Sequence, residues 1–142
     1  MFKKSIYLAA YCLLFSLVMG LSHAEQKAGA DDKTELTNFH LILTGNTVEG
    51  KTVSSQTSYK MYFHPSGKLA RHDSKANKAN VEKGSWRISN TTDLCITFAA
   101  EKCFTVKKRG DGEFDLYAPN EELIFTIDKV ILGNPNKYDA LT

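Results

Sequence analysis

Two short runs, Leu94-Cys95-Ile96-Thr97-Phe98 and Cys103-Phe104-Thr105-Val106, decide how this chain is expected to fold. Each run alternates along its length, and the intervening residues 99–102 are enough for a turn, so the segment predicts an antiparallel hairpin. If Cys95 faces Cys103, the same register places five apolar side chains on one face of the hairpin. Those side chains are Leu94, Ile96, Phe98, Phe104 and Val106.

The two cysteines lie on the opposite face of this hairpin, together with Thr97 and Thr105. Because the apolar register and the cysteine register agree, we predict a disulfide between Cys95 and Cys103. A redox pair and a metal site are the alternatives. Both are weaker, because the sequence has no C-x-x-C spacing here and no histidine near either cysteine, so no metal site is predicted.

Alternating patterns continue on both sides of the hairpin. Pro65-Ser66-Gly67 and Gly110-Asp111-Gly112 are turn signals between alternating runs, and Pro119-Asn120 is another. Together these patterns predict strands at 57–64, 68–73, 81–89, 94–98, 103–106, 113–118 and 122–130.

The expected fold class is all-β: a small antiparallel meander barrel of about seven to eight strands with one short N-terminal helix. A long meander exposes two unpaired edges, and closing it into a barrel removes them. Two sheets packed as a sandwich are the alternative architecture.

The short helix is predicted over residues 34–43 and would pack across the end of the sheet. Gly45-Asn46 can end this helix, and four of its residues fall at helical spacing, namely Leu36, Phe39, His40 and Leu43. One domain is expected over 34–136. A flexible leader at 25–33 precedes it and a polar tail at 137–142 follows it.

Composition separates the first 24 residues from the rest. The chain has 142 residues, 42% of them hydrophobic, with 18 basic and 16 acidic residues and a formal net charge of +2. Residues 1–24 carry Lys3 and Lys4 and no acidic residue, so the remainder has 16 basic and 16 acidic residues. This balance argues against nucleic-acid binding.

Residues 1–24 have the order of a secretory signal peptide. The two lysines precede an apolar run that Gly20 ends, and Ser22-His23-Ala24 supplies small residues for cleavage after Ala24. The run is short for a spanning helix, so a retained membrane anchor is the less favoured alternative. We therefore expect a periplasmic or secreted protein with no membrane span after signal removal. Loss of Cys12 with the signal would leave the even pair Cys95 and Cys103.

An ordered set of short motifs carries a family resemblance. In chain order these are Gly45-Asn46-Thr47, Gly84-x-Trp86, Leu94-Cys95, Cys103-Phe104, Gly110-Asp111-Gly112 and Gly133-Asn134-Pro135. The set resembles a family of small exported bacterial domains of unknown function, whose members look like lipocalin-like or related small β-barrels. The resemblance implies a fold and a compartment and supplies no activity.

A non-catalytic binding barrel is the favoured function, with a small apolar molecule or an envelope or host protein as its partner and no cofactor. The residues expected to line the interior are Tyr59, Met61, Phe63, Trp86 and Phe125. In a small barrel such side chains can instead fill the core. We expect this for Trp86, with its indole N–H bonded to a carbonyl, and ligand stacking is the alternative.

Catalytic groups are sparse in the remaining sequence. His64 and His72 flank one hairpin and read as exposed strand-end residues, and Ser66 lies outside a G-x-S-x-G context. The basic run Lys107-Lys108-Arg109 reads as a solvated turn edge. An enzyme is therefore not expected, and a hydrolase is only the third hypothesis.

A secreted inhibitor acting through a surface loop is the second hypothesis. The turn Ser66-Gly67-Lys68 is loosely similar to the loops that bacterial lysozyme inhibitors insert into an active-site cleft. Those inhibitors are also small, exported, disulfide-stapled barrels, and the analogy is one of fold.

Overall fold

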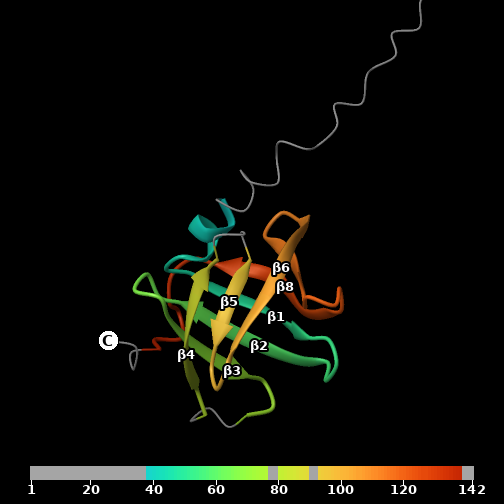
Figure 1. The fold of residues 1–142 in the computed structure, drawn as a ribbon. Coiled ribbons are helices and arrows are strands. Elements are labelled where there is room, and N and C mark those ends of the chain that lie inside the picture. Colours follow the sequence, from blue (N-terminus) through green and yellow to red (C-terminus); the bar gives the residue numbers. More distant parts are fainter. Residues whose placement is uncertain (1–37, 77–79, 90–92, 139–142) are drawn as a thin grey trace, which may run out of the picture.

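A computed structural model describes residues 38–76, 80–89 and 93–138 (Figure 1). The predicted signal peptide at 1–24 and leader at 25–33 lie outside the described residues. So do residues 34–37 of the predicted helix and 139–142 of the predicted tail.

Eight antiparallel strands form a closed barrel in which each strand pairs with its neighbours in sequence and β1 pairs with β8. The strands are β1 (Thr47–Thr52), β2 (Thr57–Phe63), β3 (Lys68–Asp73), β4 (Glu82–Ile88), β5 (Leu94–Thr97), β6 (Glu101–Gly110), β7 (Glu113–Tyr117) and β8 (Leu123–Ile131). The predicted all-β meander barrel with one short helix is confirmed, and the sandwich alternative is wrong because the sheet closes on itself.

Strand β1 is the element that hydrophobic alternation did not predict. It contains one large apolar residue, Val48, which is fully buried, and a glycine at its centre. A Cβ at Gly50 would collide with the carbonyl of Thr126 on β8 and would lie 2.9 Å from the Tyr59 hydroxyl. The absence of a side chain at Gly50 therefore lets β1 and β8 approach closely and close the barrel.

The disulfide hairpin forms in the predicted register. Leu94 pairs with Phe104, Cys95 with Cys103, and Ile96 with Lys102. Strand β6 is longer than the predicted segment 103–106, because the exposed residues that follow Val106 continue to pair with β7 as far as Gly110.

Residues 38–43 are helical and cover one end of the barrel (Figure 1). Phe39 and Leu43 are fully buried, whereas His40 is exposed and lies with its ring 5.3 Å from the Trp86 ring. After the helix, the Asn46 side chain donates to the carbonyl of Ile42 and accepts from the backbone N–H of Gly133. The polar residue after the helix thus attaches it to the end of β8.

The core fills the barrel beneath the helix. Phe63 and Trp86 meet edge to face with ring centroids 5.2 Å apart, and Phe39 packs against Phe114 at 4.7 Å. The Trp86 indole Nε1 donates a 3.0 Å hydrogen bond to the carbonyl of His64, which agrees with the prediction that a carbonyl would accept this proton. The helix end of the barrel is therefore packed with side chains.

Candidate functional site

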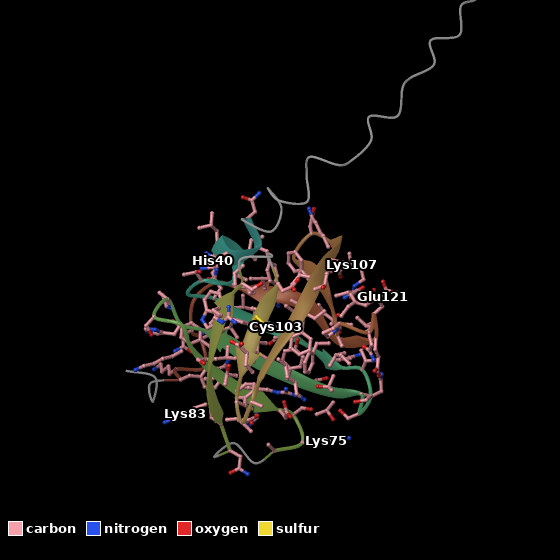
Figure 2. The ribbon with its side chains drawn as sticks, in the orientation of Figure 1. His40, Lys75, Lys83, Cys103, Lys107 and Glu121 are labelled. Atoms are coloured by element: carbon pink, nitrogen blue, oxygen red, sulfur yellow. A yellow bond between two sulfur atoms is a disulfide. The ribbon has the colours of Figure 1, made fainter. Side chains whose placement is uncertain are left out.

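The end of the barrel opposite the helix holds a pocket of about 430 Å³. Because the strands form an up-and-down meander, the β1–β2, β3–β4, β5–β6 and β7–β8 turns gather at this end. In Figure 2, His40 marks the helix end of the barrel and Lys75 marks the opposite end. The pocket is lined by Met61, Arg71, Glu82, Ile96, Phe98, Ala99, Ala100, Lys102, Phe104 and Phe125.

Apolar side chains make up most of the walls of this pocket at the open mouth of the barrel, called the mouth pocket below. Met61, Ile96 and Phe104 are inward-facing residues of β2, β5 and β6, and all three are buried. The Phe98 ring lies over Gly84, where a Cβ would come within 2.7 Å of it. This glycine therefore leaves room for an aromatic side chain in the wall of the pocket.

The structure divides the five residues predicted to line a ligand site. Met61 and Phe125 line the mouth pocket. Phe63 and Trp86 do not, since they are 1% and 6% exposed in the core at the helix end. Tyr59 is also buried, and its hydroxyl donates to the carbonyl of Thr126. Alternation predicted which side chains face inward, but it did not distinguish the packed end from the open one.

Arg71 is the functional candidate that the sequence analysis missed. It lies opposite Met61 in the β2–β3 register. It is also two residues after the buried Leu69 on β3 and so shares its face, which is the face toward the barrel interior. Its Nε and Nη2 donate to the two carboxylate oxygens of Asp73 at 2.7 and 3.2 Å. The signal in the sequence was an arginine at an inward position of a strand, which is uncommon unless the charge is paired or used.

Arg71 is also held by aromatic rings and a hydroxyl. Its guanidinium carbon lies 5.2 Å from the centroid of the Tyr59 ring and 5.4 Å from that of Phe125. Nη2 also donates to Thr52 Oγ1 at 3.1 Å. The side chain is only 14% exposed, so the mouth pocket has a fixed cation at its edge.

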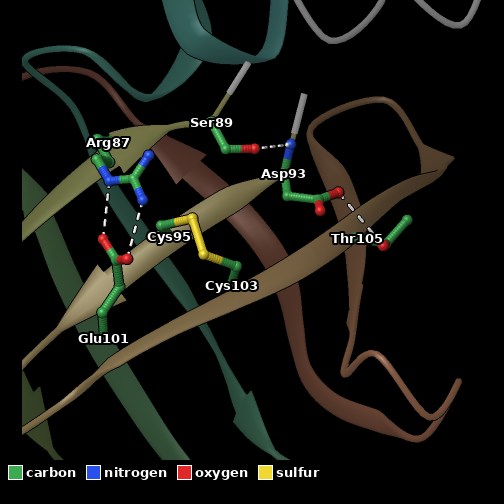
Figure 3. Close-up of a disulfide and its surroundings, with 7 residues drawn as sticks. All are labelled: Arg87, Ser89, Asp93, Cys95, Glu101, Cys103 and Thr105. Atoms are coloured by element: carbon green, nitrogen blue, oxygen red, sulfur yellow. Dashed lines mark hydrogen bonds and ion pairs between the residues drawn. A yellow bond between two sulfur atoms is a disulfide. The ribbon is translucent and has the colours of Figure 1, made fainter. Parts of the chain in front are cut away.

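The predicted disulfide pair comes together across β5 and β6, where Cys95 and Cys103 are bonded (Figure 3). Beside it, Arg87 donates to both carboxylate oxygens of Glu101 at 2.8 and 2.9 Å. These hydrogen bonds lower the pKa of the Glu101 carboxyl and raise that of Arg87. Glu101 and the two cysteines are near enough to one another to share an ion, but disulfide sulfurs are not thiolate ligands and the carboxylate is taken by Arg87.

The predicted interaction loop forms a tight turn between β2 and β3. Ser66 is exposed, and its Oγ lies 2.7 Å from His64 Nδ1, which also accepts the Ser66 backbone N–H. The backbone N–H of Gly67 donates to the carbonyl of His64, and Gly67 has a φ of 86°. Spacing alone did not predict this contact between a serine and a histidine two residues apart.

The two strand-end histidines are not brought together. His64 bonds within the turn, whereas His72 pairs with Lys60 in the β2–β3 register. His72 borders a separate hollow of about 500 Å³ that is flanked by charged residues, including Glu49 and Lys60, which form a 2.7 Å ion pair. The Nε2 atom of His72 is buried and has no hydrogen-bond partner among the described residues.

Acidic neighbours surround the basic run. Arg109 forms ion pairs with Asp115 at 3.1 Å and Asp128 at 2.6 Å, and Lys107 lies 4.5 Å from the centre of the Tyr117 ring. These contacts keep the run against its own barrel. In the described part of the chain, no helix has the length and apolar character needed to cross a membrane.

The fold and the mouth pocket together define a small closed antiparallel barrel with one packed end and one hollowed end. The chain matches no protein-family model and no curated protein.

Proposed function

We propose that this protein is a non-catalytic binding barrel that takes up a small, largely apolar molecule in the mouth pocket. The observation that carries the proposal is the pocket itself, about 430 Å³ in volume and walled by Met61, Ile96, Phe98, Phe104 and Phe125. That volume lies in the range of sites for small organic ligands, and a few polar groups at an apolar site are their usual composition. Binding would bury the apolar surface that the open end exposes.

The proposed working place is the periplasm or the exterior of the cell. The order of charged, apolar and small residues in 1–24 supports export, and so does the resemblance to small exported bacterial barrels. Oxidising conditions there would maintain the bond between Cys95 and Cys103. The intact mass of protein recovered from its own cell envelope tests this, because export with the expected cleavage gives a chain that begins at Glu25.

Ligand binding is tested with N-phenyl-1-naphthylamine, a neutral probe that fluoresces in apolar surroundings. The wild-type protein should raise its fluorescence saturably. Ala99→Trp places a large side chain at the pocket and should weaken binding at least tenfold. Ser54→Trp is the matched control, because this exposed residue of the β1–β2 turn lies at the same end outside the pocket lining.

Equal binding by both tryptophan variants would contradict the mouth pocket as the site, and no saturable binding by the wild type would contradict the proposed function. Native mass spectrometry of protein purified from its own envelope gives an independent reading. A copurified small molecule that Ala99→Trp lacks would support the pocket, whereas an empty wild-type protein that also ignores the probe would reject it.

Docking of a protein through the β2–β3 turn is the second candidate function. The observation that favours it is the order of the turn, in which the His64 carbonyl and ring hold the backbone N–H groups of Gly67 and Ser66. A preordered loop loses little conformational freedom on binding. Inhibition of lysozyme by the wild type but not by Ser66→Trp would support the inhibitor version, and full lysozyme activity at micromolar excess would remove it.

A further inference from the structure

We infer that the ligand of the mouth pocket carries a carboxylate or similar anionic group, which Arg71 and Lys102 bind while the apolar body lies against the phenylalanine rings. This inference rests on the proposed ligand pocket and names the chemical class of its occupant. It follows from the placement of one fixed and one exposed cation at the edge of an apolar hollow.

Arg71 is already oriented before any ligand binds. Asp73 accepts hydrogen bonds from its Nε and Nη2, Thr52 Oγ1 accepts a second one from Nη2, and its guanidinium carbon lies 5.2 and 5.4 Å from the ring centroids of Tyr59 and Phe125. A side chain fixed in this way loses little rotamer freedom when it binds an anion. The fixed orientation of the Arg71 side chain is therefore suited to ligand recognition as well as to stabilising the fold.

The hydrogen bonds of Arg71 do not exhaust its donors. A guanidinium group has five N–H donors. The hydrogen bonds that Arg71 makes to described protein atoms come from Nε and Nη2. The two N–H groups of Nη1 remain for a ligand. Because the side chain is mostly withdrawn from water, a charge-assisted hydrogen bond from Nη1 is less weakened by solvent than one at an exposed site.

Lys102 supplies the second cation. It lies opposite Ile96 in the β5–β6 register, lines the mouth pocket and is exposed. The two cations thus come from β3 and β6. The phenylalanine rings belong to the lining of the same pocket. An anionic group at the mouth would meet both charges without leaving an apolar body in water.

Two acidic residues near the pocket, Asp73 and Glu82, are possible partners for a cationic ligand, and they differ in their surroundings. Asp73 has both carboxylate oxygens engaged by Arg71. Glu82 lies opposite Arg71 in the β3–β4 register and is exposed, so water screens its attraction for a cation. Asp73 and Glu82 balance Arg71 and Lys102 in formal charge, so recognition of an anion rests on the Nη1 donors of the buried arginine rather than on a net positive charge.

A matched ligand series tests the sign of the charge on the unmodified protein. Octanoate, 1-octanol and octylammonium share one apolar chain and differ in the headgroup, and each is titrated against bound N-phenyl-1-naphthylamine at pH 7. Octanoate should displace the probe at about one tenth of the 1-octanol concentration or less, as expected for an added charge-assisted hydrogen bond. Octylammonium should be the weakest.

The outcomes separate this inference from the proposed function. Equal displacement by octanoate and 1-octanol, or a preference for octylammonium, would overturn the anionic ligand and leave an apolar pocket in place. Displacement by none of the three from a protein that binds the probe would also overturn it. A protein that binds neither probe nor ligand would instead reject the pocket itself.

Variants locate the anionic subsite. Arg71→Lys keeps a cation beside Asp73 but removes the planar fork, and Lys102→Met removes the exposed charge. Each should weaken octanoate binding about five- to tenfold and weaken 1-octanol binding by a smaller factor, because the alcohol carries no charge. Lys83→Met is the control, because this exposed lysine of β4 lies outside the pocket lining. An equal loss for both ligands would mean that the variants damage the pocket, which would count against a headgroup role.

Discussion

The indole Nε1 of Trp86 donates a hydrogen bond to the backbone carbonyl of His64 across 3.0 Å. This bond links the interior of β4 to the residue that follows β2. The backbone N–H of Trp86 also donates to the carbonyl of Gly67, so one residue holds both sides of the β2–β3 turn. Packing at the closed end and the shape of the exposed turn are therefore coupled through Trp86.

Trp86→Phe should lower the free energy of unfolding by about 1–3 kcal/mol, because it removes the indole hydrogen bond to the His64 carbonyl, which then keeps the Gly67 N–H as a donor, and removes part of a buried ring. Urea denaturation followed by far-ultraviolet circular dichroism measures this, since the variant lacks the only tryptophan. Leu132→Ala is the control. Its side chain is 85% exposed, and the expected change is below about 0.5 kcal/mol. Similar losses in both variants would contradict the role given to Trp86.

The sequence was sufficient for the hairpin at the centre of the fold because two independent patterns coincide there. The cysteine spacing and the apolar alternation select the same register, in which Cys95 faces Cys103 and Leu94 faces Phe104. At β1 no such agreement exists. Val48 alone gives no period, and the close approach at Gly50 is a property of the closed barrel rather than of the local sequence.

The disulfide should contribute roughly 2–3 kcal/mol to stability through the short loop that it closes. A Cys95→Ala/Cys103→Ala variant is expected to unfold at a correspondingly lower urea concentration. Reductant should destabilise the wild type to a similar extent and leave the double variant unchanged. Intact mass with and without reductant reports the bond directly, and free thiols at both positions in protein purified without reductant would refute it.

Gly50→Ala should destabilise the barrel by about 1–3 kcal/mol, because the added methyl group overlaps the Thr126 carbonyl at the β1–β8 pair that closes the sheet. Elsewhere in a strand, alanine is ordinarily more favourable than glycine. Ser85→Ala on an exposed position of β4 is the control and should change stability little. Thermal unfolding of the two variants tests the difference. A Gly50→Ala protein as stable as the wild type would show that β1 and β8 are not closely packed at Gly50.

The candidate site was less predictable than the fold for a physical reason. Alternation places Met61 and Phe63 on the same inner face, yet Met61 lines the mouth pocket and Phe63 is packed beneath the helix. The difference depends on their position along the barrel axis, which follows from the closed topology. Arg71 likewise became a candidate only when its register opposite Met61 placed it inside the barrel.

Tyr59 should make the fold sensitive to alkaline pH. Burial raises its pKa above the ordinary tyrosine value, outweighing the lowering by Arg71. The unfolded chain therefore loses this proton at lower pH than the folded one, so the associated stability is complete below about pH 10 and declines as the pH rises toward the folded pKa. In a titration of phenolate absorbance, one tyrosine of the wild type should ionise only as the protein unfolds.

Tyr59→Phe should remove that late ionisation, and it should cost about 1 kcal/mol at neutral pH through loss of the 2.9 Å hydrogen bond to the Thr126 carbonyl. Tyr117→Phe is the matched control, because Tyr117 is only partly buried and should leave the late-ionising group in place. Because the Tyr59 hydroxyl joins β2 to β8 beside Arg71, its loss should also loosen the wall of the mouth pocket. Late ionisation that persists in Tyr59→Phe would assign the buried phenol to another residue.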